Sequence, residues 1–536
     1  MTLPLVPAPA IAELHDGNLV VRDGSPLVVG SAELIPVAKQ FIEDVRIDTG
    51  ITLALDNQAE APVITVALDV TDLGAVAVAQ GIRADGASAA DERYGLRITA
   101  DNVHVWAATA EGVYRALTSL RQLISARAEN GTATLDAASV IDGPRYAWRG
   151  LSLDVVRAFH APETLRRVID MCALHKLNVL HLHLTDDQGW RIEVPSRPAL
   201  TTVGSIGAYG DRPGGYYTVA EMTALSAYAA ERFVTLVPEI DMPGHTGAIF
   251  HAYPELASGS ADDDHIEGVS ILNPESEKTW AFVEDVLDAV IPQFPQSAYL
   301  HVGGDEAFGM PDEAHAAFVE RASALVRARG RLALGWQEIA RAELRPDEIV
   351  QYWMDSGDSE SLLNIDTLSK LVPAALLPLI AETAEKAKHD APRALSMGTK
   401  LIISSLSRLY FDRPHAEASA DPAQDELRAH VGFPIYPPLS IRDGVEWDPV
   451  DDTPGVPDDS VVAGVEAAIW CETIADRDQL ELMLLPRLGG AAEKAWAPRR
   501  PTSWDDYAPR LSAQSGIWTA RGWNWYQTQE VDWTKA

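Results

Sequence analysis

Two adjacent carboxylates, Asp305 and Glu306, are the residues of this sequence best placed to do chemistry. They follow a short apolar run with the character of a buried strand, and two glycines that permit a sharp turn, in the segment Tyr299–Glu306. An isolated Asp-Glu pair more often begins a loop or caps a helix. In a partly dry site, however, two neighbouring carboxyl groups cannot both ionise easily, so one keeps its proton. That group can act as general acid and then base, while a charged neighbour stabilises developing positive charge.

Polar and aromatic side chains recur at comparable places, directly after other short apolar runs. Each of them alone has a structural explanation. A buried tryptophan usually belongs to a core, and an aspartate and an arginine can form an ion pair with each other. Together they predict a sugar pocket, since flat aromatic walls suit the apolar face of a sugar and charged groups suit its hydroxyls. The residues are Asp154, Arg157, Asp186, Asp187, Gln188, Trp190, Arg191, Glu239, Asp241, His245, Trp336, Trp353, Tyr410, Asp412, Trp470 and Glu472.

The elements that must position these residues alternate between strand and helix from Trp148 onward. Eight β/α units in about 350 residues predict a (β/α)₈ barrel, whose chemistry lies at the C-terminal ends of its strands. An α/β fold of this kind is expected over residues 143–505, with a helical insertion expected near 354–397, at the catalytic mouth. The predicted strands are Arg149–Asp154, Asn178–Leu184, Val234–Ile240, Tyr299–Gly304, Leu332–Trp336, Ile349–Trp353, Lys400–Ser404 and Val465–Trp470.

Residues 1–142 predict a small α+β domain that precedes the barrel. A hairpin is expected from Tyr94 to Ala107 and an amphipathic helix from Glu111 to Ile124. The segment carries no cluster of acids, histidines and aromatics, so we expect no chemistry of its own. The tail, residues 506–536, is rich in tryptophan; a sugar platform is one interpretation, and packing of a helical and aromatic tail onto the barrel is the favoured one.

Composition excludes several classes of function. The chain has 536 residues, 47% of them hydrophobic and 23% charged, with a formal net charge of −35. Such negative charge repels phosphate backbones and anionic membranes, so neither nucleic acid nor membrane is an expected partner. The two cysteines, Cys172 and Cys471, are far apart in sequence and suggest neither a disulfide framework nor a metal site. The N-terminal residues lack the pattern of a signal peptide, so a cytoplasmic protein is expected unless the chain was trimmed.

Four ordered blocks of the predicted barrel resemble glycoside hydrolase family 20, the β-N-acetylhexosaminidases. These blocks are Leu184–Arg191, Pro238–His245, His301–Glu306 and Gly335–Ile339. The resemblance covers the chain from about Arg145 to the tail, and the first domain resembles the small α+β domain that precedes the barrel in this family. It implies an exo-acting enzyme that releases terminal N-acetylglucosamine or N-acetylgalactosamine from β-linked glycosides such as chitobiose. The implied mechanism retains configuration and uses the substrate's own acetamido group, through an oxazolinium ring.

The resemblance also implies roles for particular residues. Glu306 would be the general acid and base, and Asp305 would orient the acetamido group. Tyr410 would hold the acetamido oxygen, although the segment Ser404–Asp412 matches the family only loosely. The remaining residues would bind or support the sugar: Trp336, Trp353 and Trp470 around the acetyl methyl, Arg157, Asp412 and Glu472 at the hydroxyls, and Asp186 with His245 behind Glu306.

Two alternatives remain from the sequence. His181-Leu-His183 is similar to the His-x-His of metal-dependent barrel hydrolases, but these histidines are expected inside the strand rather than at its rim. A sugar-binding relative without activity should have lost Asp305 or Glu306, and both are present. The sequence therefore predicts an enzyme acting on a small oligosaccharide or glycoside with no metal or organic cofactor. It leaves the preferred sugar, the aglycone and the oligomeric state open.

Overall fold

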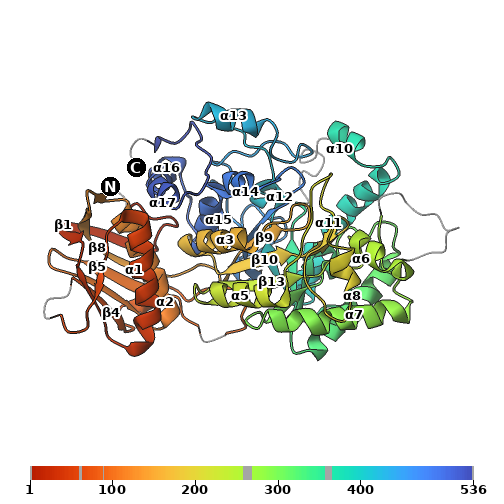
Figure 1. Cartoon of the computed structure of the whole chain (residues 1–536), viewed down its shortest axis with the longest axis horizontal. Helices are drawn as coiled ribbons and strands as arrows, with labels where there is room; N and C mark the ends of the chain where they lie inside the picture. Colours follow the sequence, from red (N-terminus) through yellow and green to blue (C-terminus); the bar gives the residue numbers. More distant parts are fainter. Residues whose placement is uncertain (1–2, 60–62, 88–89, 258–268, 356–364, 534–536) are drawn as a thin grey trace.

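The computed structural model describes residues 3–59, 63–87, 90–257, 269–355 and 365–533. A smaller N-terminal domain lies at one end of the molecule and a closed eight-stranded barrel with surrounding helices forms the rest (Figure 1). Among the helices of the described ranges, none has the length and apolar character needed to cross a bilayer.

The N-terminal domain is one eight-stranded sheet with two helices. The predicted hairpin is confirmed, because β5 (Tyr94–Ile98) and β6 (Val103–Ala107) pair antiparallel. The predicted helix is α2 (Ala110–Ser125), whose N-cap Thr109 accepts a hydrogen bond from the Gly112 N–H. The other elements are β1 (Ile11–Arg22), β2 (Pro26–Val29), α1 (Ile35–Thr49), β3 (Ala54–Leu55), β4 (Ile64–Leu68), β7 (Ala128–Glu129) and β8 (Thr132–Asp142).

All eight predicted barrel strands are present and pair in parallel around a closed ring. The largest difference at a C-terminal end is in β14, which ends three residues before the predicted Gly304. Gly303 and Gly304 have φ angles of 71° and 99°, so the backbone leaves the extended conformation there. The strands are β9 (Trp148–Asp154), β10 (Val179–His183), β13 (Thr235–Glu239), β14 (Tyr299–His301), β15 (Leu332–Trp336), β16 (Ile349–Tyr352), β17 (Lys400–Ile403) and β18 (Val462–Ile469).

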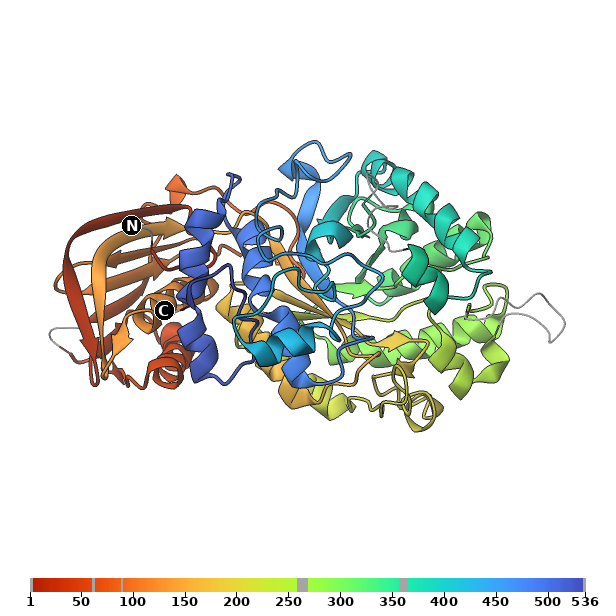
Figure 2. The ribbon, with the colours of Figure 1, turned by 90° about the horizontal axis from the view of Figure 1, so that it is seen from above.

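Helices surround this ring of strands, as Figure 2 shows from above. The longest of them, α11, contacts β16 and β17 and so occupies the place of the sixth barrel helix. The stretch near 354–397 is thus in part a regular barrel unit, and α10 is the described helix added to it. The helices between strands are α3 (Pro162–Leu174), α5 (Val219–Ala230), α7 (Glu277–Val290), α8 (Asp312–Ala328), α10 (Ile365–Leu371), α11 (Leu377–Ser396) and, after β18, α15 (Arg487–Trp496). Shorter elements are β11 (Thr185–Asp186), β12 (Gly189–Trp190), α4 (Ala199–Thr202), α6 (Gly247–Ala252), α12 (Leu406–Leu409), α13 (Pro422–Arg428) and α14 (Arg477–Leu484).

The two domains are held together by α2 and by the C-terminal tail. Gln122 of α2 donates a hydrogen bond to the Leu174 carbonyl at the end of α3, at 3.0 Å. In the tail, which contains α16 (Trp504–Ser512) and α17 (Ser515–Ala520), Trp518 is fully buried. Arg521 forms ion pairs of 2.7 and 2.6 Å with Asp44 and Asp48 of α1. The tail is therefore packed against the N-terminal domain as well as the barrel, and we propose Asp142 as the last residue of that domain.

Candidate active site

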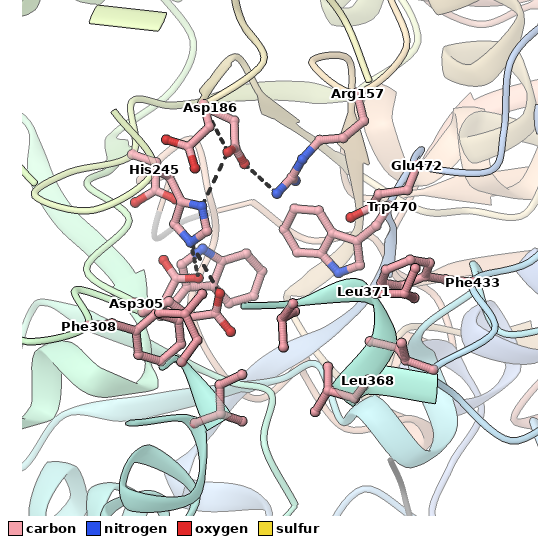
Figure 3. Close-up of a pocket in the computed structure, with 18 of the residues that line it drawn as sticks. Arg157, Asp186, His245, Asp305, Phe308, Leu368, Leu371, Phe433, Trp470 and Glu472 are labelled. Atoms are coloured by element: carbon pink, nitrogen blue, oxygen red, sulfur yellow. Dashed lines mark hydrogen bonds and ion pairs between the residues drawn. The ribbon is translucent and has the colours of Figure 1, made fainter. Parts of the chain in front are cut away.

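A pocket of about 270 Å³ opens at the C-terminal ends of the barrel strands. Figure 3 shows Asp186, His245 and Arg157 along one edge of it, with Leu368 and Leu371 across the pocket from them. Of the residues to which the family resemblance assigns roles, all except Asp412 line this pocket: Arg157, Asp186, His245, Asp305, Glu306, Trp336, Trp353, Tyr410, Trp470 and Glu472. Of the other residues expected there, Asp187 and Asp241 line it, whereas Asp154, Gln188, Trp190, Arg191 and Glu239 do not.

The turn that carries the two carboxylates requires both of its glycines. A Cβ at Gly303 would lie 1.6 Å from Asp241 Oδ1, and one at Gly304 would lie 2.4 Å from Ile339 Cγ2. Glu306 itself has a φ of 47°, a left-handed conformation that costs a non-glycine residue of order 1–3 kcal/mol. The surrounding packing therefore holds Glu306 in an unfavourable backbone conformation that directs its side chain into the pocket.

The two carboxylates differ in exposure. The Asp305 side chain is 12% exposed, whereas the Glu306 side chain is 35% exposed. Asp305 Oδ1 is shielded from solvent and has no hydrogen-bond partner among the described residues. Burial raises the pKa of both groups; the neighbouring carboxylates Asp241 and Glu306 raise that of Asp305 further, while His245 opposes the shift in both.

These pKa directions support a proton-bearing Glu306 and modify the expectation for Asp305. The sequence suggested that Asp305 stays charged, but its pKa is held well above the ordinary value in the unliganded pocket. A positive charge forming on a bound sugar would lower that pKa again, because an opposite charge nearby favours the carboxylate.

A chain of charged groups supports Glu306 from behind. Arg157 Nη2 lies 2.6 Å from Asp186 Oδ2, and Asp186 Oδ1 lies 3.2 Å from His245 Nδ1. His245 Nε2 then lies 3.6 Å from both Asp305 Oδ2 and Glu306 Oε2 (Figure 3). Burial disfavours charge on Asp186, yet Arg157 and the two neighbouring histidines outweigh it and hold its pKa well below the ordinary value. Burial likewise opposes the imidazolium of His245, but the surrounding carboxylates outweigh burial and raise its pKa.

The layer of the barrel interior next to the pocket is polar, whereas Val179, Val237, Leu334 and Ile349 belong to an apolar cluster of the same strands. Glu239 lies at its centre, 2.8 Å from His183 Nδ1, 3.1 Å from His181 Nε2 and 3.1 Å from His301 Nδ1. The Trp336 indole N–H also donates to Glu239, at 2.7 Å. Burial disfavours the Glu239 carboxylate, but the three histidines outweigh it and lower its pKa. This network orients Trp336 and His183 from below.

The position of His183 differs from the one expected from the sequence. It was expected inside the barrel away from the rim, but as the last residue of β10 it lines the pocket. Its Nε2 lies 2.9 Å from Asp186 Oδ2, so His183 links the interior network to the chain behind Glu306. The signal in the sequence was its position only three residues before Asp186.

Three tryptophans and a tyrosine form the wall opposite the acids. Trp353 lies parallel to Tyr410, with ring centroids 6.3 Å apart and planes inclined by 11°. Trp470 lies edge-on to Tyr410 at 6.2 Å and contacts Trp336 at 5.7 Å. The indole N–H of Trp353 donates to Glu338, at 3.2 Å. These rings present flat apolar faces to the pocket, which suit an acetyl methyl group.

The hydroxyl-binding set is less uniform than the sequence suggested. Arg157 lies over the face of Trp470, at 5.3 Å from the ring centroid, and Glu472 lines the pocket beside them. Asp412 differs, because it is fully buried and does not line the pocket. Burial and the charge of Glu472 raise its pKa. Tyr436, which the sequence interpretation missed, lines the pocket and meets Tyr410 edge-on at 6.0 Å. Its signal was an aromatic residue in a loop rich in glycine and proline.

Some of these groups have the spacing of metal ligands. His183, Glu239 and Asp241 bring ligand atoms within 4.8 Å of one another, as do Asp241, His245 and Asp305. His183 cannot serve as a ligand without losing a bond, since both of its ring nitrogens are engaged by Glu239 and Asp186. His245 has its Nδ1 committed to Asp186, and its Nε2 faces the two catalytic candidates at 3.6 Å. The donor set therefore fits an acid–base pocket better than a dedicated metal centre.

Comparisons with known proteins agree with this geometry. The model of the catalytic domain of glycosyl hydrolase family 20 matches residues 146–368 and 379–499, and the model of domain 2 of the same family matches residues 2–143. A β-N-acetylhexosaminidase of Cellulomonas fimi is 35% identical over 99% of this chain and 97% of its own length. The N,N'-diacetylchitobiase of Vibrio harveyi is 25% identical, and the match spans 62% of that longer protein.

Solved structures give the same result. The family 20 β-N-acetylhexosaminidase of Streptomyces coelicolor superposes with a TM-score of 0.82 at 33% identity, over 99% of both chains. An N-acetyl-β-hexosaminidase of Streptomyces plicatus superposes with a TM-score of 0.81 at 33% identity, over 99% of this chain and 98% of its own. Family models that match both domains, together with a relative 35% identical along almost the whole chain, place this protein in glycoside hydrolase family 20.

Proposed function

We propose that this enzyme is an exo-acting β-N-acetylhexosaminidase that removes terminal, non-reducing N-acetylglucosamine or N-acetylgalactosamine from β-linked glycosides. The observation that carries the proposal is the pocket itself, in which Asp305 and Glu306 face a cage of Trp336, Trp353 and Trp470. Arg157 and Glu472 bind the hydroxyls of one terminal sugar. The proposal is further supported by its similarity to proteins named as β-N-acetylhexosaminidases.

The nucleophile in this mechanism is the substrate's own acetamido oxygen. The tryptophans press the acetamido group beneath the anomeric carbon, so the attack is intramolecular and has a high effective molarity. Asp305 accepts a hydrogen bond from the acetamido N–H, and Tyr410 aligns the carbonyl oxygen. As the C1–oxygen bond of the glycoside breaks, the Asp305 carboxylate stabilises the oxazolinium ring that forms.

Glu306 moves the proton in both steps. It first protonates the departing glycosidic oxygen. The resulting carboxylate then takes a proton from water as that water attacks C1 and opens the oxazolinium ring. Two displacements at C1 leave the configuration retained. His245, held by Asp186 and Arg157, is a positioning residue that keeps cationic charge 3.6 Å from Glu306.

Hydrolysis of chitobiose and of chromogenic N-acetylglucosaminides and N-acetylgalactosaminides tests the activity directly. Release of single sugars from the non-reducing end of longer chito-oligosaccharides is expected, and cleavage of internal bonds without monosaccharide would contradict exo-action. A thiazoline mimic of the oxazolinium ring should inhibit tightly. If a fluorinated sugar instead trapped a covalent glycosyl adduct on Asp305, detected by mass spectrometry, the substrate-assisted mechanism would be wrong.

A further inference from the structure

One side of the pocket is apolar and is built largely by the added segment after β16. Six apolar side chains line it, and none of them belongs to the sugar-binding cage: Phe308, Leu368, Leu371, Val372, Leu376 and Ile380. In Figure 3, Leu368 and Leu371 lie on the side of the pocket away from Asp186 and His245. We call these six residues the aliphatic wall.

Leu371 is the most informative member of the aliphatic wall. It is 49% exposed although it lines the pocket, so a large apolar side chain faces solvent at the mouth. Leu368, one turn earlier in α10, is almost fully buried and supplies the packing of that helix. A single exposed leucine is ordinary on a protein surface, but Leu371 adjoins five other apolar side chains and so extends an apolar surface from the pocket to solvent.

Half of this wall lies outside the family model, whereas Phe308, Leu368 and Ile380 lie within its matched parts. The catalytic-domain model of the family matches up to residue 368 and resumes at 379, so Leu371, Val372 and Leu376 lie in the interruption. The sugar-binding cage, by contrast, lies within the matched parts. The wall therefore combines matched residues with three residues outside the family model, and it adjoins the place of the aglycone.

The face of α11 that carries Lys386 is polar, in contrast to the aliphatic wall. Lys386 there forms ion pairs with Asp312 at 2.6 Å and with Glu382 at 2.9 Å, in a separate hollow that also reaches Glu306. A second sugar would find hydrogen-bonding partners on that face. The aliphatic wall has no charged member. A sugar hydroxyl placed against it would lose its hydrogen bonds to water and gain none from the protein.

We propose that the aliphatic wall is an aglycone subsite that selects β-N-acetylhexosaminides whose leaving group is apolar, an alkyl or aryl group rather than a second sugar. The inference rests on the proposed function, because the aglycone is placed by the sugar bound beside Glu306. The leaving oxygen must lie next to Glu306, and Phe308, two residues further along, begins the wall at that point.

The test compares ethyl, butyl and hexyl β-N-acetylglucosaminides with chitobiose, all well below micelle-forming concentrations. These alcohols are similar leaving groups, so differences between them report binding of the alkyl chain. Each methylene covered by the wall should raise kcat/KM about two- to fourfold. Leu371→Asn and Ile380→Asn should each remove much of the gain for the hexyl glycoside, with less than about a twofold change for the ethyl glycoside and chitobiose.

Ile206→Asn is the matched control, since Ile206 is 68% exposed and lies outside the pocket lining. Thermal unfolding confirms that each variant is folded. Equal kcat/KM for ethyl and hexyl glycosides in the unmodified enzyme would overturn the inference, as would a chain-length preference that both wall variants retain. Failure of the proposed function looks different, because then neither the glycosides nor chitobiose would be cleaved.

Discussion

Asp305→Asn is the substitution that most directly tests the proposed mechanism. Asparagine keeps the shape of the side chain and removes only the charge that would face the oxazolinium ring. For unit charges about 4 Å apart at an effective dielectric constant near 20, the attraction is about 4 kcal/mol. Asp305 is 9% exposed, so little solvent screens it. Since about 1.4 kcal/mol corresponds to a factor of ten in rate, kcat should fall by roughly a thousandfold.

The assay is steady-state hydrolysis of 4-nitrophenyl N-acetylglucosaminide and of chitobiose. The loss should be similar for both substrates, because Asp305 acts on the acetamido group and not on the leaving oxygen. Asp101→Asn, in the exposed turn between β5 and β6, is the control for the chemical change. A loss of less than tenfold, or one that depends strongly on the leaving group, would refute the assigned role of Asp305.

The other predictions concern Glu306 and the absence of a metal requirement. Glu306→Gln should lower turnover of chitobiose by about 10²–10⁴-fold and that of a dinitrophenyl glycoside far less, because a good leaving group needs no proton; equal losses would contradict the acid role. Burial raises the pKa of Glu306, so the acid keeps its proton to higher pH than a free glutamic acid, and kcat/KM for chitobiose should decline on the alkaline side as that proton is lost. Glu306→Gln should lack this alkaline decline, and its persistence would assign it to another group. Activity should survive dialysis against EDTA, and a loss restored by a divalent ion would favour the metal-dependent alternative.

Much of the site could be predicted from the sequence because a barrel obeys a simple geometric rule. The ends of parallel strands meet at one edge, so residues that follow successive strands must converge there. Arg157, His245, Asp305 and Trp470 come from four different strand ends, and all line the pocket. Their types already indicated a sugar pocket with acid chemistry, and the ordered motifs indicated the family.

Only the tertiary structure decided what each side chain faces. Asp412 follows a barrel strand like its neighbours but is fully buried behind the pocket wall, which depends on the path of a loop that periodicity does not describe. Glu239 looks in sequence like one more strand-end acid, yet it is held below the pocket by three histidines from two other strands. The sequence around Leu371 predicts only a leucine-rich helix. Its place at the pocket mouth depends on how α10 packs. Residue types and spacing determined which groups meet, whereas burial and long-range contacts determined their charge and orientation.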